Sequence, residues 1–370
     1  MTITGRIRER GINAVLIGLL FVGTGFGSCF AQSKDFSARP GTDSVQNDVD
    51  KIRLTANLNL NAVAISVNPA VNSTFEERKP TVAPHGKRLY FSRSNHPRNS
   101  GGVEDLEDIW YTEYDSVSAL WSEPILLPGK LNNAGPNFIS GISVTGDTIF
   151  LGNQYKKNGK MRNGLSYAVN VKGTFSDPIP FPVKNDYNIS QHENAFVSLK
   201  AGVIISAVQR VDTQGDRDLY VSFWNGKTGT EPVNMGMAIN SELEESSPYL
   251  AADTKTLYFA SKGHHGYGGY DIFVTRRLDE TWTNWTTPEN LGPAVNGAMD
   301  DEYFTISVCK KFAFFSKQIS EHNVDIFRIP VAELFNLPAG EKTKAVNVKN
   351  IAKDKNGKET KATVSSLTTL

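Results

Sequence analysis

Hydrophobic positions along this chain recur with a period of roughly 55 residues. Each recurrence is a short run of β-branched, aromatic and aliphatic residues that follows a turn of mostly polar or small residues. Successive turns begin 53 to 60 residues apart. Runs of this length and composition are typical of β-strands, so the period predicts a repeat architecture built from strands. The five runs are RLYFSR at 88–93, TIFLGN at 148–153, VIISAV at 203–208, TLYFAS at 256–261 and FAFFSK at 312–317.

A second element of the repeat is an Asp that opens the following strand and precedes an aliphatic and an aromatic residue. The second unit departs from this pattern, because Leu165 stands at the Asp position. Asp side chains accept hydrogen bonds from backbone amides in turns, and a residue present in four copies is more typical of architecture than of catalysis. We therefore expect these residues to order the entry to the strand. The four are Asp108, Asp218, Asp271 and Asp325.

A third element is a segment with an aromatic residue, a Pro and a terminal Asn, as in Trp285, Pro288 and Asn296. Pro suits an outer strand, because it cannot donate a hydrogen bond to a central ladder. We interpret the segment as the fourth and outermost strand of each unit, with its aromatic residue packed in the core.

The fifth unit lacks this segment after Ile329, but residues 62–72 supply a copy at the front of the chain, and PAVN at 69–72 repeats PAVN at 293–296. Ring closure explains the displacement, since an N-terminal strand that completes the last unit removes long unpaired edges. The sequence thus predicts an all-β protein, a five-bladed β-propeller closed by an N-terminal strand, with a short C-terminal tail. The alternatives are an open array, another β-fold or a sixth, degenerate blade.

Residues 1–31 have the order of a signal peptide, with Arg residues first, then an apolar run at 14–22, then small residues. The apolar run is too short to span a bilayer comfortably. We expect cleavage after Ala31, and lipidation of Cys29 is the alternative. The predicted location is therefore exported, in the periplasm or at the outer-membrane periphery. Cys309 is then the one Cys left in the mature chain, which predicts that no intrachain disulfide stabilises it.

Overall composition is ordinary for a folded protein, with 39% hydrophobic and 21% charged residues and a formal net charge of zero. The charge is unevenly spread, because residues 341–370 carry seven Lys against three acidic residues. The body of the chain is consequently mildly acidic and lacks a basic stripe. Since nucleic-acid binding depends on clustered Lys and Arg, this distribution argues against a nucleic-acid partner.

The repeat resembles the TolB-type, WD-repeat-like propeller blade. The resemblance is carried by SPYLAADTKTLYFASKGHHGYGGYDIFVTRR at 247–277, WTTPENLGPAVN at 285–296 and DEYFTIS at 301–307. Such blades are frequent in OmpA-family envelope proteins, where the propeller precedes a small carboxypeptidase-regulatory-like β-domain. The Lys-rich tail at 341–370 is similar to the first strands of that module. The expected domains are the signal peptide 1–31, a linker 32–57, the propeller 58–340 and this tail.

Familiar catalytic motifs are missing from the chain, among them HExxH, GxSxG, the Walker loop and paired CxxC. The repeat therefore predicts no catalytic residue, no cofactor and no metal ligand set. Acidic residues precede several first strands, at 76–77, 193, 242–245 and 300–302. We interpret them as a solvated face, with a rim of calcium ligands as the alternative.

Loops between the second and third strands vary between units, and variable loops on a fixed scaffold are where function tends to reside. They emerge on the same face as the connections between blades. These loops are 94–107, 153–164, 209–217, 262–270 and 317–324. Residues in or beside them that we expect to contact a partner are Arg93, Asn95, His96, Asn153, Arg210, Lys262, His264, His265, Tyr267 and Lys317.

Three functions compete on these observations. The export signal, the repeat and the missing motifs favour a non-enzymatic envelope scaffold that binds a protein or peptidoglycan, with outer-membrane association through that partner or through lipid on Cys29. The first alternative is a glycan- or peptide-cleaving propeller enzyme. It predicts a cluster of ionisable residues with perturbed pKa values at the mouth of the central channel. The second alternative is a sensor for a small ligand or a metal.

Overall fold

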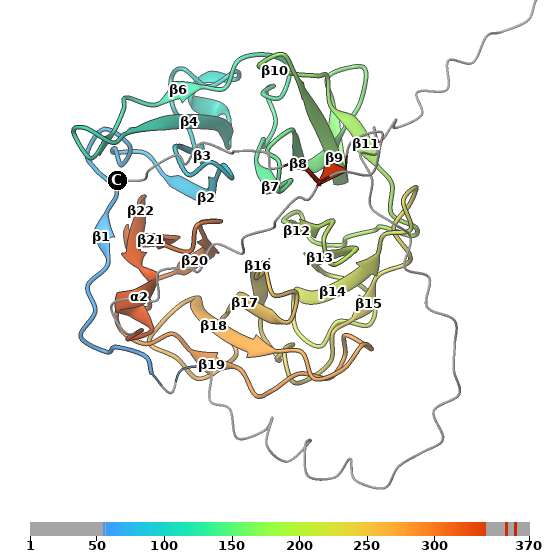
Figure 1. Ribbon diagram of the computed structural model, residues 1–370. Coiled ribbons are helices and arrows are strands. Elements are labelled where there is room, and N and C mark those ends of the chain that lie inside the picture. The colour runs from blue at the N-terminus through green and yellow to red at the C-terminus, as the bar shows by residue number, and fades with distance from the viewer. Residues whose placement is uncertain (1–54, 56, 338–351, 354–358, 361–370) are drawn as a thin grey trace, which may run out of the picture. The chain divides into compact units, whose positions relative to one another are not determined.

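A computed structural model describes residues 55, 57–337, 352–353 and 359–360. The predicted signal peptide, Cys29, nearly all of the linker and most of the tail lie outside the described residues. Five of the six antiparallel sheets that the described residues form are arranged around a common centre (Figure 1), and there is almost no helix. The predicted fold class, an all-β five-bladed β-propeller, is confirmed.

Each blade is a meander whose first strand lies nearest the centre (Figure 1). Blade one consists of β2 (Glu77–Val82), β3 (Arg88–Arg93), β4 (Asp108–Asp115), β5 (Leu120–Trp121) and β6 (Ile125–Leu126). Blade two consists of β7 (Ile139–Ile142), β8 (Thr148–Tyr155), β9 (Met161–Val171), β10 (Thr174–Phe175) and β11 (Ile179–Phe181). Blade three consists of β12 (Asn194–Ser198), β13 (Val203–Val208), β14 (Asp218–Phe223) and β15 (Val233–Asn234). Blade four consists of β16 (Glu245–Leu250), β17 (Thr256–Ser261), β18 (Asp271–Arg276) and β19 (Glu289–Asn290).

Blade five closes the ring with the N-terminal strand, as predicted. Its sheet has the order β1 (Ile65–Ser66), β22 (Asn323–Pro330), β21 (Phe312–Ser320) and β20 (Asp301–Ile306). β1 pairs antiparallel with β22, so that Ile65 lies opposite Arg328. The remaining short elements are η1 (Gly102–Glu104), α2 (Val331–Leu334) and the paired strands β23 (Ala352–Lys353) and β24 (Glu359–Thr360). In the described part of the chain, no helix is both long and apolar enough to cross a membrane.

The terminal Asn of the fourth segment clamps the third strand. The Asn296 side chain accepts a hydrogen bond from the backbone N–H of Ile272 (2.8 Å) and donates one to its carbonyl oxygen (2.9 Å). Asn72 makes the same two bonds to Ile326, although the two residues lie 254 positions apart. The clamp therefore explains why the Asn recurs, and it also fastens the closing segment to blade five. The same pair of bonds joins Asn132 to Ile109 and Asn240 to Leu219.

Buried apolar side chains fall into five clusters, one between each pair of neighbouring blades. The cluster between blades three and four contains thirteen buried residues, whereas the cluster between blades two and three contains five. Burial of apolar area is the main favourable term in folding. The five clusters therefore hold the ring together, and the junction between blades two and three is the least packed of the five.

Two of the loops that we expected to be long and irregular are ordered hairpins instead. In blade two the pairing of β8 with β9 continues to Tyr155 opposite Met161, and in blade five β21 and β22 pair as far as Ser320 opposite Asn323. The expectation of irregular loops at 153–164 and 317–324 is therefore wrong. The reason is that backbone hydrogen bonding extends the strand pairs of these two blades further from the body than in the other three.

Candidate functional site

The innermost strands of blades one, four and five each contain a β-bulge near their first residues. The register shifts between Arg78 and Thr81, between Ser246 and Tyr249, and between Glu302 and Thr305. Each bulge holds a residue other than Gly at positive φ, with values of 57° at Lys79, 51° at Ser247 and 57° at Tyr303. Bulges re-aim side chains, and this sparsely populated backbone region is enriched at functional sites. The three bulges thus mark the starts of the inner strands as a candidate site.

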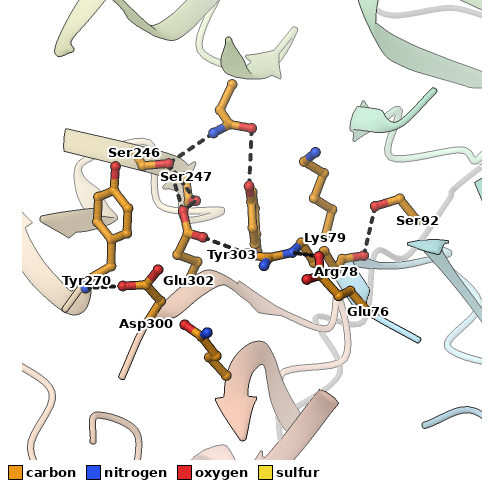
Figure 2. A network of polar contacts seen from close by, with 12 residues as sticks. Glu76, Arg78, Lys79, Ser92, Ser246, Ser247, Tyr270, Asp300, Glu302 and Tyr303 are labelled. Carbon is orange, nitrogen blue, oxygen red and sulfur yellow. Dashed lines mark hydrogen bonds and ion pairs between the residues drawn. The ribbon is translucent and has the colours of Figure 1, made fainter. Parts of the chain in front are cut away.

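A polar network joins side chains from four different blades at this place (Figure 2). The Arg78 guanidinium lies 3.3 Å from a carboxylate oxygen of Glu302. The other Glu302 oxygen accepts hydrogen bonds from the hydroxyls of Ser246 (2.9 Å) and Ser247 (3.1 Å). The Asn194 amide donates to the Ser246 hydroxyl at 2.9 Å. The Glu302 carboxylate is therefore held in place by three donors that come from two other blades.

Lys79 lies beside this network, in the same view (Figure 2). Its ammonium group donates to both carboxylate oxygens of Glu107, at 2.5 and 2.7 Å, and lies 3.9 Å from the centre of the Phe138 ring. Ser92 donates to the same carboxylate at 2.7 Å. The side chains of Lys79 and Glu107 are each 11% exposed, so this ion pair is nearly buried.

Burial and neighbouring charge shift the pKa values of several of these groups. Burial lowers the pKa of Lys79 below its ordinary value, against the opposite effect of Glu107. Burial also acts to lower the pKa of Arg78, but Glu302 and other acidic groups outweigh it, and the pKa ends above its ordinary value. Burial, assisted by the charge of Glu302, raises the pKa of Tyr303. The site therefore combines an ammonium group that gives up its proton more readily than an ordinary Lys with an Arg that stays charged, at short distance.

A second cluster of charges lies between blades three and four. The Glu244 carboxylate accepts hydrogen bonds from Lys262 (2.8 Å) and from the Tyr270 hydroxyl (2.7 Å), and Arg217 donates to that hydroxyl at 2.7 Å. Burial alone would raise the pKa of Glu244, but these donors and the charge of Arg217 lower it to about 2. This carboxylate is ionised at any physiological pH and acts as a fixed negative charge.

The repeated Asp residues behave differently from blade to blade. Asp108 accepts a hydrogen bond from the backbone amide of Ser100 at 2.6 Å, Asp218 accepts one from Gln214 at 3.0 Å, and Asp271 accepts one from Tyr267. Asp325 instead lies within β22 opposite Lys317. Its Oδ1 is buried without a hydrogen-bond partner, as is Oδ1 of Asp108 and of Asp271. The short hairpin of blade five brings no loop amide back to this Asp.

Two of the residues that we expected to contact a partner are buried. The Arg93 side chain is 5% exposed and pairs with Glu77 at 2.7 Å. The expectation that Arg93 is exposed to a partner is therefore wrong, because its guanidinium pairs with the buried carboxyl group of Glu77 in its own blade. Arg210 is also 5% exposed, but it lines a pocket between blades two and three.

Two more of the expected partner contacts are tied into the protein by hydrogen bonds. The Asn153 amide donates to the carbonyl oxygen of Pro136 at 2.9 Å. The Lys317 ammonium pairs with Asp301 at 2.9 Å. These contacts stabilise the blades and leave less of each side chain available to a partner.

The other six are partly or fully exposed. His96 packs edge-on against Trp110 with ring centroids 4.7 Å apart, and burial lowers its pKa. His264 lies 2.7 Å from the carbonyl oxygen of Ile239 through Nε2. The exposed members are Asn95, Lys262, His265 and Tyr267. Two of them already have partners, because Lys262 pairs with Glu244 and the Asn95 amide donates to the carbonyl oxygen of Val103.

Sequence reasoning missed the residues that form the central network. The acidic runs at 76–77 and 300–302 were interpreted as a solvated face or calcium ligands, whereas Glu302 faces the centre and Asp301 faces the second strand of its own blade. Glu302 and Asp301 are neighbours in one strand, so their side chains point to opposite faces of the sheet. This alternation is the sequence signal that could have told the two residues apart. Within the described residues, no group of three or more His, Cys, Asp or Glu side chains is placed to hold a metal ion.

Comparison with known proteins identifies the fold but no close relative. No family model and no curated protein matches the chain. A solved complex of BT0996 with RGII is 10% identical, with a TM-score of 0.51 over 77% of this chain and 94% of its own. A structure described as "Glycoside hydrolase" is 11% identical, with a TM-score of 0.50 over 79% of this chain and 96% of its own. An α-L-arabinofuranosidase from Lactobacillus brevis is 12% identical over 72% of this chain and 92% of its own, with a TM-score of 0.41.

These findings correct the functional prediction. The chain was expected to be a non-enzymatic envelope scaffold, but the similar solved propellers include glycoside hydrolases and do not support a TolB- or OmpA-type protein. The predicted mark of the enzyme alternative is also present, namely ionisable residues with shifted pKa values at the centre. The scaffold function and the prediction that the chain is not an enzyme are therefore contradicted. At 10 to 11% identity the similarity shows the fold alone.

Proposed function

We propose that this propeller is a glycan-cleaving enzyme that binds its substrate at the centre, over the starts of the innermost strands. The observation that carries the proposal is the central network, in which Arg78, Lys79 and Tyr303 have shifted pKa values beside the Glu302 and Glu107 carboxylates. Clusters of titratable groups with shifted pKa values are typical of catalytic sites.

The chemistry of the network suits a sugar. Sugar hydroxyls both donate and accept hydrogen bonds, and this site offers ammonium and guanidinium donors within a few ångströms of carboxylate acceptors. The aromatic ring of Phe138 under Lys79 and the ring of Tyr303 add flat apolar surface beside these polar groups. The solved propeller described as a glycoside hydrolase supports the same substrate class, although fold by itself does not determine function.

A substrate panel tests the proposal. Purified protein is incubated with aryl glycosides of the common sugars, with plant polysaccharides and with peptidoglycan, and released reducing ends are measured. We expect cleavage of at least one glycan, with Glu302→Gln lowering kcat/KM by at least about 10-fold because it removes a charged acceptor that Arg78 and two hydroxyls position. Glu280→Gln is the control, since its side chain is 86% exposed and belongs to an ion pair with Arg277 away from the network. No activity on the whole panel would contradict the proposal.

Two further statements are proposals that rest on sequence. The blade residues at 247–277 support a TolB-type relationship, and the order of residues 1–31 supports export to the periplasm or the outer-membrane periphery. An exported enzyme of this kind would meet peptidoglycan or other envelope glycans, and peptidoglycan is in the panel for that reason. Secretion of a fusion that carries residues 1–31, and its loss when the fusion begins at residue 32, tests the location.

A further inference from the structure

The hairpin between the second and third strands of blade two ends in a turn of unusual charge. Residues 156–160 have the sequence KKNGK, so three lysines and no acidic residue stand in one turn, which we call the lysine turn. Every residue of the turn is exposed. Among the described residues, Lys156, Lys157 and Lys160 make no ion pair and no side-chain hydrogen bond. Like charges this close together repel, so the turn carries positive charge that its described surroundings do not neutralise.

The equivalent loops of the other four blades use their lysines differently. Lys262 in blade four pairs with Glu244 at 2.8 Å, and Lys317 in blade five pairs with Asp301 at 2.9 Å. The loops of blades one and three contain no Lys. Blade two is therefore the one blade whose loop between the second and third strands presents unpaired ammonium groups, within the described part of the chain.

Backbone pairing holds the lysine turn in a defined shape. β8 and β9 pair as far as Tyr155 opposite Met161, immediately before and after the turn. Within the turn, the Lys156 amide donates to the carbonyl oxygen of Lys160 at 2.9 Å, and the Gly159 amide donates to that of Lys156 at 3.0 Å. The backbone that carries the three ammonium groups is thus ordered before any ligand arrives, which lowers the entropic cost of binding.

The foot of this hairpin contacts the segment that supports the central network. Tyr155 is 9% exposed, and its hydroxyl donates to the carbonyl oxygen of Leu131 (2.7 Å) and accepts from the Asn137 amide (2.9 Å). The next residue, Phe138, has its ring 3.9 Å from the Lys79 ammonium group. The lysine turn and the cationic side of the central network are therefore mounted on the same connection between blades one and two.

The composition of the lysine turn indicates the class of its ligand. Lys is a compact charge that binds the oxygens of an anion without a strict geometry. The turn has no apolar or aromatic side chain, such as insertion into a membrane interface or stacking on nucleic-acid bases requires. The body of the chain is mildly acidic, so a broad basic surface for a nucleic acid is also missing. A glycan with acidic sugars fits both the charge of the turn and the central network beside it.

We propose that the lysine turn binds acidic sugars of a glycan whose chain extends to the central network, so that the substrate class is an acidic polysaccharide with carboxylate or sulfate groups. This inference rests on the proposed function, which places a glycan at the centre. The turn supplies local positive charge that the acidic body does not, and such a charge raises the rate at which a polyanion associates with the protein.

Binding of acidic and neutral forms of the same polymer tests the inference. The full chain is titrated by calorimetry, at low and at high salt, with polygalacturonate and its methyl ester and with dextran sulfate and dextran. We expect at least one acidic polymer to bind at least about 10-fold more tightly than its neutral form, with a smaller difference at high salt, because salt screens exposed charges. The two pairs of polymers separate carboxylate from sulfate recognition.

Two triple variants locate the binding. The first removes the charge of the lysine turn and should weaken binding of the acidic polymer by about 10-fold, without an effect on its neutral form; it carries Lys156→Gln, Lys157→Gln and Lys160→Gln. The matched control removes the same charge from exposed turns on the opposite face and should stay within about twofold of the wild type; it carries Lys87→Gln, Lys172→Gln and Lys227→Gln. All six side chains are exposed, so both variants should fold.

Equal binding of the acidic and neutral polymers, or equal weakening in the two triple variants, overturns the inference and leaves the proposed function standing. Vesicles of phosphatidylglycerol and single-stranded DNA are the competing probes, and a loss confined to either of them in the first variant also overturns it. Cleavage is not needed for this test. Acidic polymer bound through the lysine turn, together with no cleavage on the substrate panel, would confirm the binding surface and refute the enzymatic activity alone.

Discussion

The junction between blades three and four and the junction between blades two and three are built from the same repeat, but different groups fill them. Thirteen buried apolar residues pack the first, and five pack the second. At the first, Arg217 and Tyr270 bridge from blade to blade, whereas at the second Gly164 offers no side chain and a pocket remains. One junction is closed by packing, and the other is left open.

The equivalent carboxyl groups show what this difference means. Glu245 is satisfied by hydroxyl and amide donors within its own blade and the preceding loop, so it serves the fold. Glu193 occupies the same position in blade three, where Val208 replaces the second serine donor, and its carboxyl accepts a hydrogen bond from the Gly164 amide of blade two. A repeat makes the structural role of a residue recognisable, and the place where the repeat fails is where a single asymmetric site can form. Four experiments test this contrast, in order of expected effect.

Core truncation should have the largest effect, and it should be larger at the packed junction. Phe259→Ala at the junction of blades three and four should lower the free energy of unfolding by about 3–5 kcal/mol, because Phe259 is 1% exposed and surrounded by aromatic and aliphatic neighbours. Phe150→Ala at the junction of blades two and three should lower the free energy of unfolding by about 1 kcal/mol less than Phe259→Ala does, because the neighbours of Phe150 can relax toward the pocket. Urea unfolding measures both, and equal or reversed costs would refute the contrast in packing.

Removing an Asn clamp should rank second. Asn240→Ala in blade three leaves the buried N–H of Leu219 without its partner, while the Leu219 carbonyl oxygen keeps the hydrogen bond from the Met235 amide, and the change should lower the free energy of unfolding by about 2–3 kcal/mol. In blade two the repeat supplies Asn185, whose φ is 51° and whose amide reaches the exposed Glu231 instead. Asn185→Gly should therefore change stability by less than about 0.5 kcal/mol, since Gly adopts that backbone conformation freely. A large loss at residue 185 would contradict the special status of blade two.

Filling the pocket should rank third. Gly164→Ala introduces a methyl group 3.0 Å from Asp186 Oδ2 at a φ of 123°. We expect the free energy of unfolding to fall by about 1–3 kcal/mol, from the strained backbone and the close contact. Gly173→Ala in the same blade has φ at 91° and open space around the new methyl group, so it carries the strain without filling the pocket and should lose less. Urea unfolding measures both, and equal losses would show that the pocket accepts the methyl group.

The pH dependence of stability should differ in sign between the two junctions, with the smallest effect of the four. The pKa of Glu193 is about 7 in the folded protein against an ordinary 4.5. The folded state therefore binds a proton that the unfolded state does not, and the contribution of Glu193 to the free energy of unfolding grows as pH falls from 7 to 4.5. The pKa of Glu244 is about 2, so its contribution is present above pH 4.5 and is lost as pH falls toward 2. Urea unfolding of the wild type, Glu193→Gln and Glu244→Gln at several pH values measures both. A wild-type advantage over Glu193→Gln that shrinks between pH 7 and 5 would contradict the raised pKa.

Much of the fold was predictable because the repeat is local. Strand composition, turn spacing and the displaced PAVN segment at 69–72 indicated five blades and closure by the N-terminal strand, and both are confirmed. The prediction of irregular loops at 153–164 and 317–324 was wrong, because strand pairing can extend into a polar segment without any change in its composition. The terminal Asn was recognised as part of the repeat, but its clamp on the third strand needed the structure.

The candidate site and the pocket were less predictable for a different reason. Glu193 was noticed as one of several acidic residues before a first strand, and Arg210 was selected from a loop, but nothing in the sequence placed them beside Asp186. Lys79 was not selected at all. Its position depends on a bulge at φ 57° that turns it toward Glu107, and a bulge of this kind leaves no fixed mark in the sequence.

By itself, then, the sequence determined the blade, because strands, turns and a repeated clamp arise from short-range pattern and backbone hydrogen bonding. It also marked blade two as exceptional through Leu165, where the other units have Asp. Only the tertiary structure decided which side chains meet at the centre and in the pocket, because residues such as Arg78 and Glu302 lie 224 positions apart and converge through the packing of whole blades. Their protonation depends on burial and on charges contributed by other blades, which no local pattern contains.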